Sequence, residues 1–243
     1  MLDRLSWEKF TKARDRFRKF VTTLDKKLPF LKDIQQKFAD SRGSSYTVET
    51  PVVYNTALND ITRDDDIKLI LVADNPGRRE QAAVNKRYLV GPSGKLANNF
   101  FRNNPELKID FNKNVIILNK TPIHSPRTVE LKELCKIDTS GLLASALEES
   151  QQTMASLLMD FYTSLDCPIW ITGYSEMRKG GLFEIYTDEV NLLFADNKQI
   201  FIYRHFSMNQ FTIDLKKRML PGEPVKKALA RIGTDYRKRI LTY

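Results

Sequence analysis

The chain has 243 residues, enough for one large α/β domain or two small ones with a substantial core. Its 39 Lys and Arg against 30 Asp and Glu give a net charge of +9, which favours a polyanionic partner, nucleic acid before membrane. No window approaches the ~20 apolar residues of a membrane span, and two cysteines with two histidines leave no cluster of zinc-site spacing. We therefore expect no metal and no other cofactor.

The N-terminal stretch MLDRLSWEKF lacks the uninterrupted apolar core of a secretion signal. Cys135 and Cys167 are too far apart in sequence to suggest a disulfide framework. We expect an intracellular monomer, in the cytoplasm, nucleoid or nucleus. Within residues 4–38, apolar side chains recur at steps of three, four and seven. This pattern predicts one or two amphipathic helices, with a break at Pro29.

Four short runs are apolar and rich in β-branched or aromatic residues: IKLILVA (67–73), NVIILN (114–119), PIWITG (168–173) and QIFIYR (199–204). Runs that are apolar throughout and spaced widely enough for crossover helices indicate a parallel sheet covered on both faces. The sequence therefore predicts a three-layer α/β/α sandwich with a central four-stranded parallel sheet.

Helices are expected between and after these runs, notably at 94–103, 142–165 and the basic segment 225–241. We expect residues 1–45 to form a helical N-terminal extension and residues 46–243 to form the α/β/α domain with its basic C-terminal helix.

The stretch YLVGPSGKL (88–96) has the glycines and lysine of a phosphate-binding loop. However, Leu89 stands where the first glycine of that motif belongs, and Leu96 replaces the hydroxyl that would hold magnesium. No strong strand leads into the stretch. The phosphate-loop interpretation is therefore rejected.

Asn75, Asn119 and His205 follow the first, second and fourth apolar runs. In sheets of this kind the ligand crevice lies outside the carboxyl ends of the strands, so the three side chains should surround one crevice. Two amides and a neutral imidazole on a basic protein suit a pocket for a planar heterocycle.

At these residues the chain resembles the uracil-DNA glycosylase superfamily. ADNPG (Ala73–Gly77) is similar to the first motif of the mismatch-specific and single-strand-selective branches. RYLVGPSG (87–94) is similar to the P-F-V-G-x-A-G segment of the iron–sulfur branch, and His205-Phe206-Ser207 to the final H-P-S motif. The resemblance covers roughly residues 67–215 and implies a DNA glycosylase of base excision repair that acts on a flipped-out base.

The chain departs from the family pattern at several positions. Ala73 replaces the usual glycine, Phe206 replaces the proline that constrains the last loop, and the four iron–sulfur cysteines are absent. Gly77 stands in the base pocket where the housekeeping enzymes place a tyrosine against the methyl group of thymine. Strict exclusion of 5-substituted bases is therefore not implied.

The resemblance also implies roles for individual residues. Asn75 or Asp74 would position the attacking water, because different branches of the family place this role at one or the other. Asn119 would pair with the edge of the base, Tyr88 would stack on its face, and His205 would donate a hydrogen bond to the departing base. Alone, each has a structural alternative: a turn, a strand-end cap, a core aromatic or a buried histidine. Their shared order along the chain favours the functional interpretation.

Further residues are expected at the DNA surface. Ser93, Lys95 and Ser207 are candidates for phosphate contacts, and Met208 for the wedge that replaces the flipped base. His124 is expected to contact backbone or phosphate.

The sequence thus predicts a monofunctional DNA glycosylase for uracil or a related damaged base. The main alternative is a DNA-binding protein with the same fold and little or no catalysis. An enzyme acting on free nucleotides would need a phosphate cradle that the sequence lacks.

Overall fold

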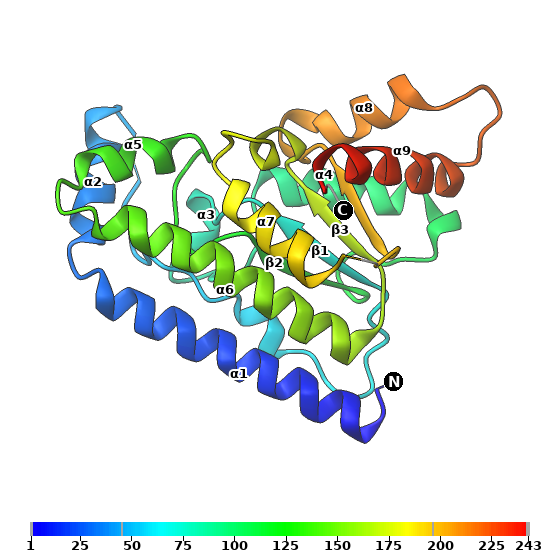
Figure 1. The fold of residues 1–243 in the computed structure, drawn as a ribbon, viewed down its shortest axis with the longest axis horizontal. Helices are drawn as coiled ribbons and strands as arrows, with labels where there is room; N and C mark the ends of the chain where they lie inside the picture. The colour runs from blue at the N-terminus through cyan, green and yellow to red at the C-terminus, as the bar shows by residue number, and fades with distance from the viewer. Residues whose placement is uncertain (1, 45, 196, 242–243) are drawn as a thin grey trace.

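The computed structural model describes residues 2–44, 46–195 and 197–241. Within these residues the centre of the molecule is a four-stranded parallel sheet in the order β2-β1-β3-β4. The strands are β1 (Leu69–Ala73), β2 (Val115–Asn119), β3 (Ile169–Thr172) and β4 (Ile200–Tyr203). Helices flank the sheet (Figure 1), so the predicted three-layer α/β/α architecture is confirmed.

Each strand falls within one of the four apolar runs. Every residue of β1 and β3 is buried, as expected for inner strands covered on both faces. Strands β1 and β2 pair from Leu69 with Val115 to Ala73 with Asn119. Because these pairs are in register, β1 and β2 end at the same level of the sheet.

The remaining elements are helical. The longer helices are α1 (Arg4–Lys27), α2 (Leu31–Ser41), α4 (Pro92–Arg102), α5 (Glu130–Ile137), α6 (Leu142–Leu165), α7 (Glu184–Leu193), α8 (Gln210–Arg218) and α9 (Val225–Ile240). Short helical turns are η1 (Thr56–Asn59), α3 (Arg78–Gln81), η2 (Pro105–Leu107), η3 (Tyr174–Met177) and η4 (Ser207–Asn209). None of the helices in the described ranges combines the length and apolar character that crossing a membrane requires.

The two helical layers have different partners. On one side α6 packs against α7, and α1 runs alongside α6 as an outer helix (Figure 1). On the other side Trp170 of β3 stacks on Phe101 of α4 and Phe211 of α8, with ring centres 5.5 and 5.8 Å apart. Helix α9 lies against β4, where the Tyr203 hydroxyl donates to the Leu229 carbonyl at 3.0 Å.

The N-terminal helix α1 shares the core of the α/β region. The Asp3 side chain caps its first turn. The Phe10 ring then meets Phe161 of α6, and the Phe17 ring packs near Tyr88. The predicted break before α2 is present between the end of α1 at Lys27 and the start of α2 at Leu31. Residues 1–45 therefore contribute, where described, to the same hydrophobic core as the sheet.

Candidate active site

The strand order creates a switch point at the carboxyl ends of β1 and β3. From β1 the chain passes to β2 on one side and then crosses to β3 on the other, and ligands of open α/β sheets bind at such a point. Asp74 directly follows β1, and Gly173 directly follows β3. Gly173 has a φ of +92°, and a Cβ atom there would lie 2.1 Å from Asp74 Oδ1. Glycine therefore allows the end of β3 to approach this carboxylate closely.

Asp74 forms a buried ion pair with Lys120, the residue after β2. Lys120 Nζ lies 2.6 Å from Asp74 Oδ1, and the lysine side chain is 0% exposed. The ammonium also donates to the Thr172 carbonyl and lies 4.9 Å from the centre of the Phe183 ring. Burial acts to raise the pKa of Asp74, but the Lys120 charge, the nearby His205 and the hydrogen bonds outweigh it, so the pKa is lowered. Asp74 is therefore a carboxylate at neutral pH.

The side chain of Asn75 braces the loop that follows β2. Its Nδ2 lies 3.1 Å from the Ser125 carbonyl oxygen, 3.0 Å from Ser125 Oγ and 3.3 Å from the Pro76 carbonyl oxygen. Its Oδ1 accepts a hydrogen bond from Thr128 Oγ1 at 2.9 Å. The amide thus ties the end of β1 to residues 125–128.

Asn119 carries a buried amide at the end of β2. The residue is 1% exposed, and within the described part of the chain neither its Oδ1 nor its Nδ2 has a hydrogen-bond partner. Buried amides are normally satisfied, and leaving one unpaired costs about 1–3 kcal/mol for each group. One amide therefore offers both a free donor and a free acceptor beside the switch point.

His205 lies on the loop after β4 and is partly buried. Its Nδ1 accepts a hydrogen bond from the Ser207 backbone N–H at 3.0 Å, so the neutral ring carries its proton on Nε2. Burial lowers the pKa of the imidazole; the Asp74 charge opposes this shift, and the Lys120 charge adds to it. His205 is therefore a neutral imidazole with an Nε2–H donor at neutral pH.

Phe206 anchors the loop that follows β4. Its side chain is 0% exposed and stacks on Phe211 of α8 with ring centres 4.2 Å apart. It also packs near Phe100 of α4. Aromatic packing thus fixes this loop at the position where a proline ring would restrict the backbone.

A groove of about 400 Å³ joins the segments that follow β1, β2 and β4. Ser93 and Ser207 line it, as does Met208, a residue that is 84% exposed. The groove also contains Gly77, Arg78, Arg79, Glu80, Gly91, Pro92 and Pro126. Met208 has a left-handed φ of +52°, which is uncommon for a residue other than glycine. The groove thus brings together three of the residues predicted to contact DNA.

Of the predicted site residues, Asp74, Asn75, Asn119 and His205 lie at the strand ends and do not line the groove, and Tyr88 and Lys95 lie elsewhere. Tyr88 is 2% exposed, its hydroxyl donates to the Val53 carbonyl at 2.6 Å, and its ring packs near Phe17. This placement corrects the prediction that Tyr88 stacks on a base, because the ring is enclosed by α1 and the core. Lys95 is exposed on α4 but is not one of the residues that line the groove.

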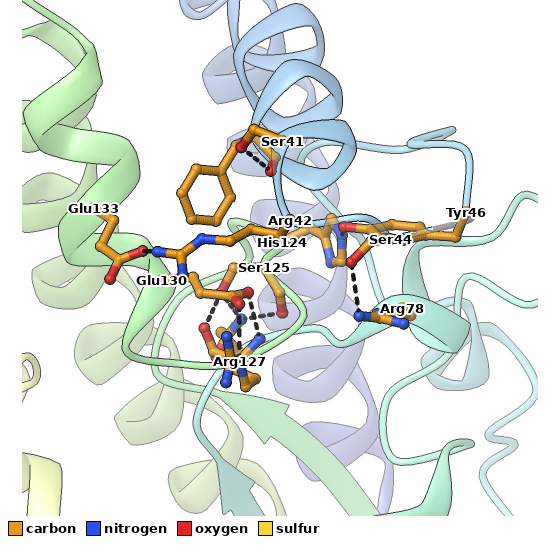
Figure 2. Close-up of polar contacts among 12 residues, drawn as sticks. Ser41, Arg42, Ser44, Tyr46, Arg78, His124, Ser125, Arg127, Glu130 and Glu133 are labelled. Atoms are coloured by element: carbon orange, nitrogen blue, oxygen red, sulfur yellow. Dashed lines mark hydrogen bonds and ion pairs between the residues drawn. The ribbon is translucent and has the colours of Figure 1, made fainter.

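His124 contacts backbone, as expected, and also a tyrosine (Figure 2). Its Nδ1 lies 2.8 Å from the Pro76 carbonyl oxygen, and its Nε2 lies 3.0 Å from the Tyr46 hydroxyl. Burial lowers the pKa of His124 to about 4. The neutral ring therefore donates from Nδ1 to the carbonyl and accepts at Nε2 from the tyrosine. It joins the segment after α2 to the turn after β1.

Arg78 and Arg127 lie near His124 and its hydrogen-bond partners (Figure 2). The guanidinium of Arg78 lies 5.0 Å from the centre of the Tyr46 ring and donates to Ser44 Oγ at 3.0 Å. The Arg127 side chain donates to Glu130 Oε1 at 2.8 Å. Both arginines are exposed, and Arg78 is one of the residues that line the groove.

Sequence reasoning missed four residues of this site. Lys120 follows Asn119 directly, and a lysine at the end of a buried strand was a usable signal. Gly173 at the end of β3 was another. Glu80 accepts hydrogen bonds from the backbone N–H groups of Gly77 and Leu89, and its place three residues after the helix cap is typical of a capping box. No feature of the sequence distinguishes Thr128 as a residue of the site.

Across the described residues, no three His, Cys, Asp or Glu side chains gather as a metal site requires. Comparison with family models, curated proteins and solved structures finds no match to this chain.

Proposed function

We propose that this chain is a DNA glycosylase that hydrolyses the N-glycosidic bond of uracil, or of a related damaged base, after the base is flipped out of DNA. The observation that carries the proposal is the amide of Asn119, buried at the end of β2 beside the switch point, with a donor and an acceptor that have no partner among the described residues. A pyrimidine with a carbonyl beside a ring N–H satisfies both groups at once.

The charged and polar groups that follow β1 and β4 suit the chemistry of glycosidic bond cleavage. When the bond between C1′ and the base nitrogen breaks, its electron pair passes to the base, and water adds to C1′ and gives up a proton that ends on the base. The neutral His205, with its proton on Nε2, can donate to a carbonyl oxygen of the base. This hydrogen bond strengthens as negative charge accumulates, so it favours the transition state over the bound substrate. Asp74 and Asn75, at the end of β1, are the candidates for orienting the water.

The groove supports a nucleic acid as the substrate. Arg78, Arg79, Ser93 and Ser207 provide cationic and hydroxyl groups for phosphates along it. Exposed Met208 stands at the same groove as an apolar side chain that can fill the space left by a flipped base. The formal net charge of +9 acts in the same direction.

The test is base release from a panel of oligonucleotides that carry uracil, xanthine, hypoxanthine or a thymine mismatch, in single and double strands, followed by alkaline cleavage. Cleavage at one or more of these bases is expected, with uracil among the substrates. DNA binding without cleavage on every substrate would favour a DNA-binding protein with this fold. Absence of both activities would remove the proposal.

A further inference from the structure

Asp74 and Asn75 differ in whether their side chains have a hydrogen-bonding group that is still available to a water molecule. The Asn75 amide has two N–H donors, and they face three acceptors from Pro76 and Ser125. Its oxygen accepts from Thr128 Oγ1 at 2.9 Å. The side chain of Asn75 is therefore committed to the loop after β2.

One carboxylate oxygen of Asp74 is available to accept a further hydrogen bond. Its Oδ1 accepts from Lys120 at 2.6 Å. In the described part of the chain, the hydroxyl that donates toward its Oδ2 is that of Thr128, at 3.4 Å. That hydroxyl has one proton, and the Asn75 oxygen is nearer to it. Oδ2 is therefore able to accept a hydrogen bond from water.

Lys120 is enclosed and cannot act as an attacking amine. It is 0% exposed, and its ammonium contacts Asp74, the Thr172 carbonyl and the ring face of Phe183. A Schiff base with a sugar would require this amine to leave all three partners. Among the described residues, the charged group that its ammonium contacts is Asp74, so we expect its effect on chemistry to pass through that carboxylate.

We infer that Lys120 is a positioning residue, which holds Asp74 as the carboxylate that orients the attacking water, while Asn75 braces the neighbouring loop. The inference rests on the proposed glycosylase function and assigns the water to one of its two candidates. In the reaction, water forms the bond to C1′ as the base departs with the electron pair, and Oδ2 of Asp74 takes the proton that water loses. The protonated carboxyl then returns this proton to solvent or to the base.

The charges around Asp74 explain how a cation at Lys120 keeps this buried carboxyl group ionised. Lys120 and His205 both lower the pKa of Asp74, whereas its burial raises it. His205 is neutral near pH 7 because its own pKa is lowered, so the cation that faces Asp74 is Lys120, at 2.6 Å. Burial lowers the pKa of Lys120, and the charge and hydrogen bond of Asp74 oppose that shift. Glu176 on η3 acts on Lys120 and favours its charged form. Without the lysine, burial would dominate, and the pKa of Asp74 should rise.

The experiment measures single-turnover base release against pH for wild type and for Asp74→Asn, Asn75→Ala and Lys120→Met. We expect Asp74→Asn to be slower by about 10²-fold or more at every pH, as when a preorganised catalytic group is lost. Asn75→Ala should lose less and keep the wild-type pH profile. Lys120→Met should move the acid limb of the profile upward by about 1–3 pH units and recover rate as pH rises. A purely structural lysine would lower the rate equally at all pH values, and that result would overturn the inference, as would a larger loss in Asn75→Ala than in Asp74→Asn.

Two controls keep the outcomes distinct. The double variant Asp74→Asn/Lys120→Met removes both buried charges, so it should fold even if Lys120→Met, with one unpaired charge, does not. If Lys120→Met does not fold, Lys120→Arg replaces it in the test. This variant keeps the cation, so it should retain the wild-type pH profile, and a profile shifted upward would contradict the inference. If the wild type releases no base, the proposed function fails. Titration of the Asp74 carboxyl by NMR in wild type and Lys120→Arg then still tests whether the cation keeps Asp74 ionised, and an Asp74 pKa above its ordinary value would overturn that part.

Discussion

Ala73 and Asn119 are in-register partners at the ends of β1 and β2, and this pairing places the carboxylate of Asp74 and the amide of Asn119 at one edge of the sheet. The two groups differ in how they are satisfied. Asp74 is paired with Lys120, whereas the Asn119 amide has no partner within the described residues. This end of the sheet therefore combines a buried ion pair with an unpaired amide, a set of groups that suits the proposed binding of a heterocycle.

The first prediction concerns His205. Replacing it with alanine should slow single-turnover base release by about 10²–10³-fold, or roughly 3–4 kcal/mol, because one preorganised donor to the departing base is lost. DNA affinity should stay nearly unchanged, because phosphate contacts dominate it. Parallel rate and binding measurements on one substrate check this. Equal losses in both would mean that His205 serves the fold.

The second prediction uses the unpaired amide of Asn119. Asn119→Leu should raise the free energy of unfolding by about 1–3 kcal/mol, because an unsatisfied buried amide is replaced by an apolar group of similar size. The same variant should lose base release. Urea unfolding of both proteins measures the first quantity.

Asn119→Asp is the companion variant for recognition. Its carboxylate cannot donate to a base carbonyl, so discrimination between uracil and other bases should weaken by about 1–3 kcal/mol. If Asn119→Leu is less stable than wild type and Asn119→Asp keeps the wild-type preference among bases, the Asn119 side chain is a strand-end cap.

The third prediction concerns Gly77 and the range of bases. Gly77 has an ordinary φ of −86°, and an added Cβ would meet no atom within 4 Å. Gly77→Tyr should therefore be tolerated by the backbone and place a ring in the groove that Gly77 lines, where the resemblance expects the base. We expect release of bases with a methyl group at C5 to fall relative to uracil, with uracil itself little affected. Competition between the two substrates in one tube measures this, and Gly77→Ala serves as the small-residue control. An unchanged preference would mean that Gly77 lies away from the base.

The fourth prediction is a pH dependence of stability from Glu80. Burial raises the pKa of Glu80 to about 7, against the opposing hydrogen bonds from the Gly77 and Leu89 N–H groups. Between pH 4.5, the ordinary value, and about 7, the folded state therefore binds more protons than the unfolded state. Stability from this group is full below the lower value and is lost as pH rises through the upper one.

A Glu80→Gln variant isolates this effect. Relative to it, wild type should lose about 3 kcal/mol of unfolding free energy between pH 4.5 and pH 7.5. Urea titrations of both proteins at the two pH values give the difference. Parallel pH curves for the two proteins would contradict the raised pKa.

The sheet was predictable because each strand is a continuous apolar run, and burial on both faces demands that pattern. Helix α6 was predicted with the bounds that the structure has, 142–165. The placement of Asn119 and His205 at strand ends also followed from the sequence, since strand ends converge on one edge.

The errors came from side-chain direction and from contacts between distant segments. Tyr88 precedes a residue with left-handed backbone, Leu89 at φ +52°, and its ring turns toward α1. The direction of the Tyr88 side chain depends on this local backbone conformation, which the sequence pattern does not predict. The pairing of Lys120 with Asp74 joins residues 46 positions apart, and only the register of β1 with β2 brings them together.

The most direct test of the central claim is to count free uracil and abasic sites on the same uracil-containing oligonucleotide under single-turnover conditions. Chromatography quantifies the base, and alkaline cleavage quantifies the sites, for wild type and for Asp74→Asn and His205→Ala. If the chain is a hydrolytic glycosylase, wild type yields base and abasic sites in equal amounts, and both variants reduce the two together. Wild-type protein that binds this DNA but yields neither product, or variants that release base at the wild-type rate, would contradict the claim.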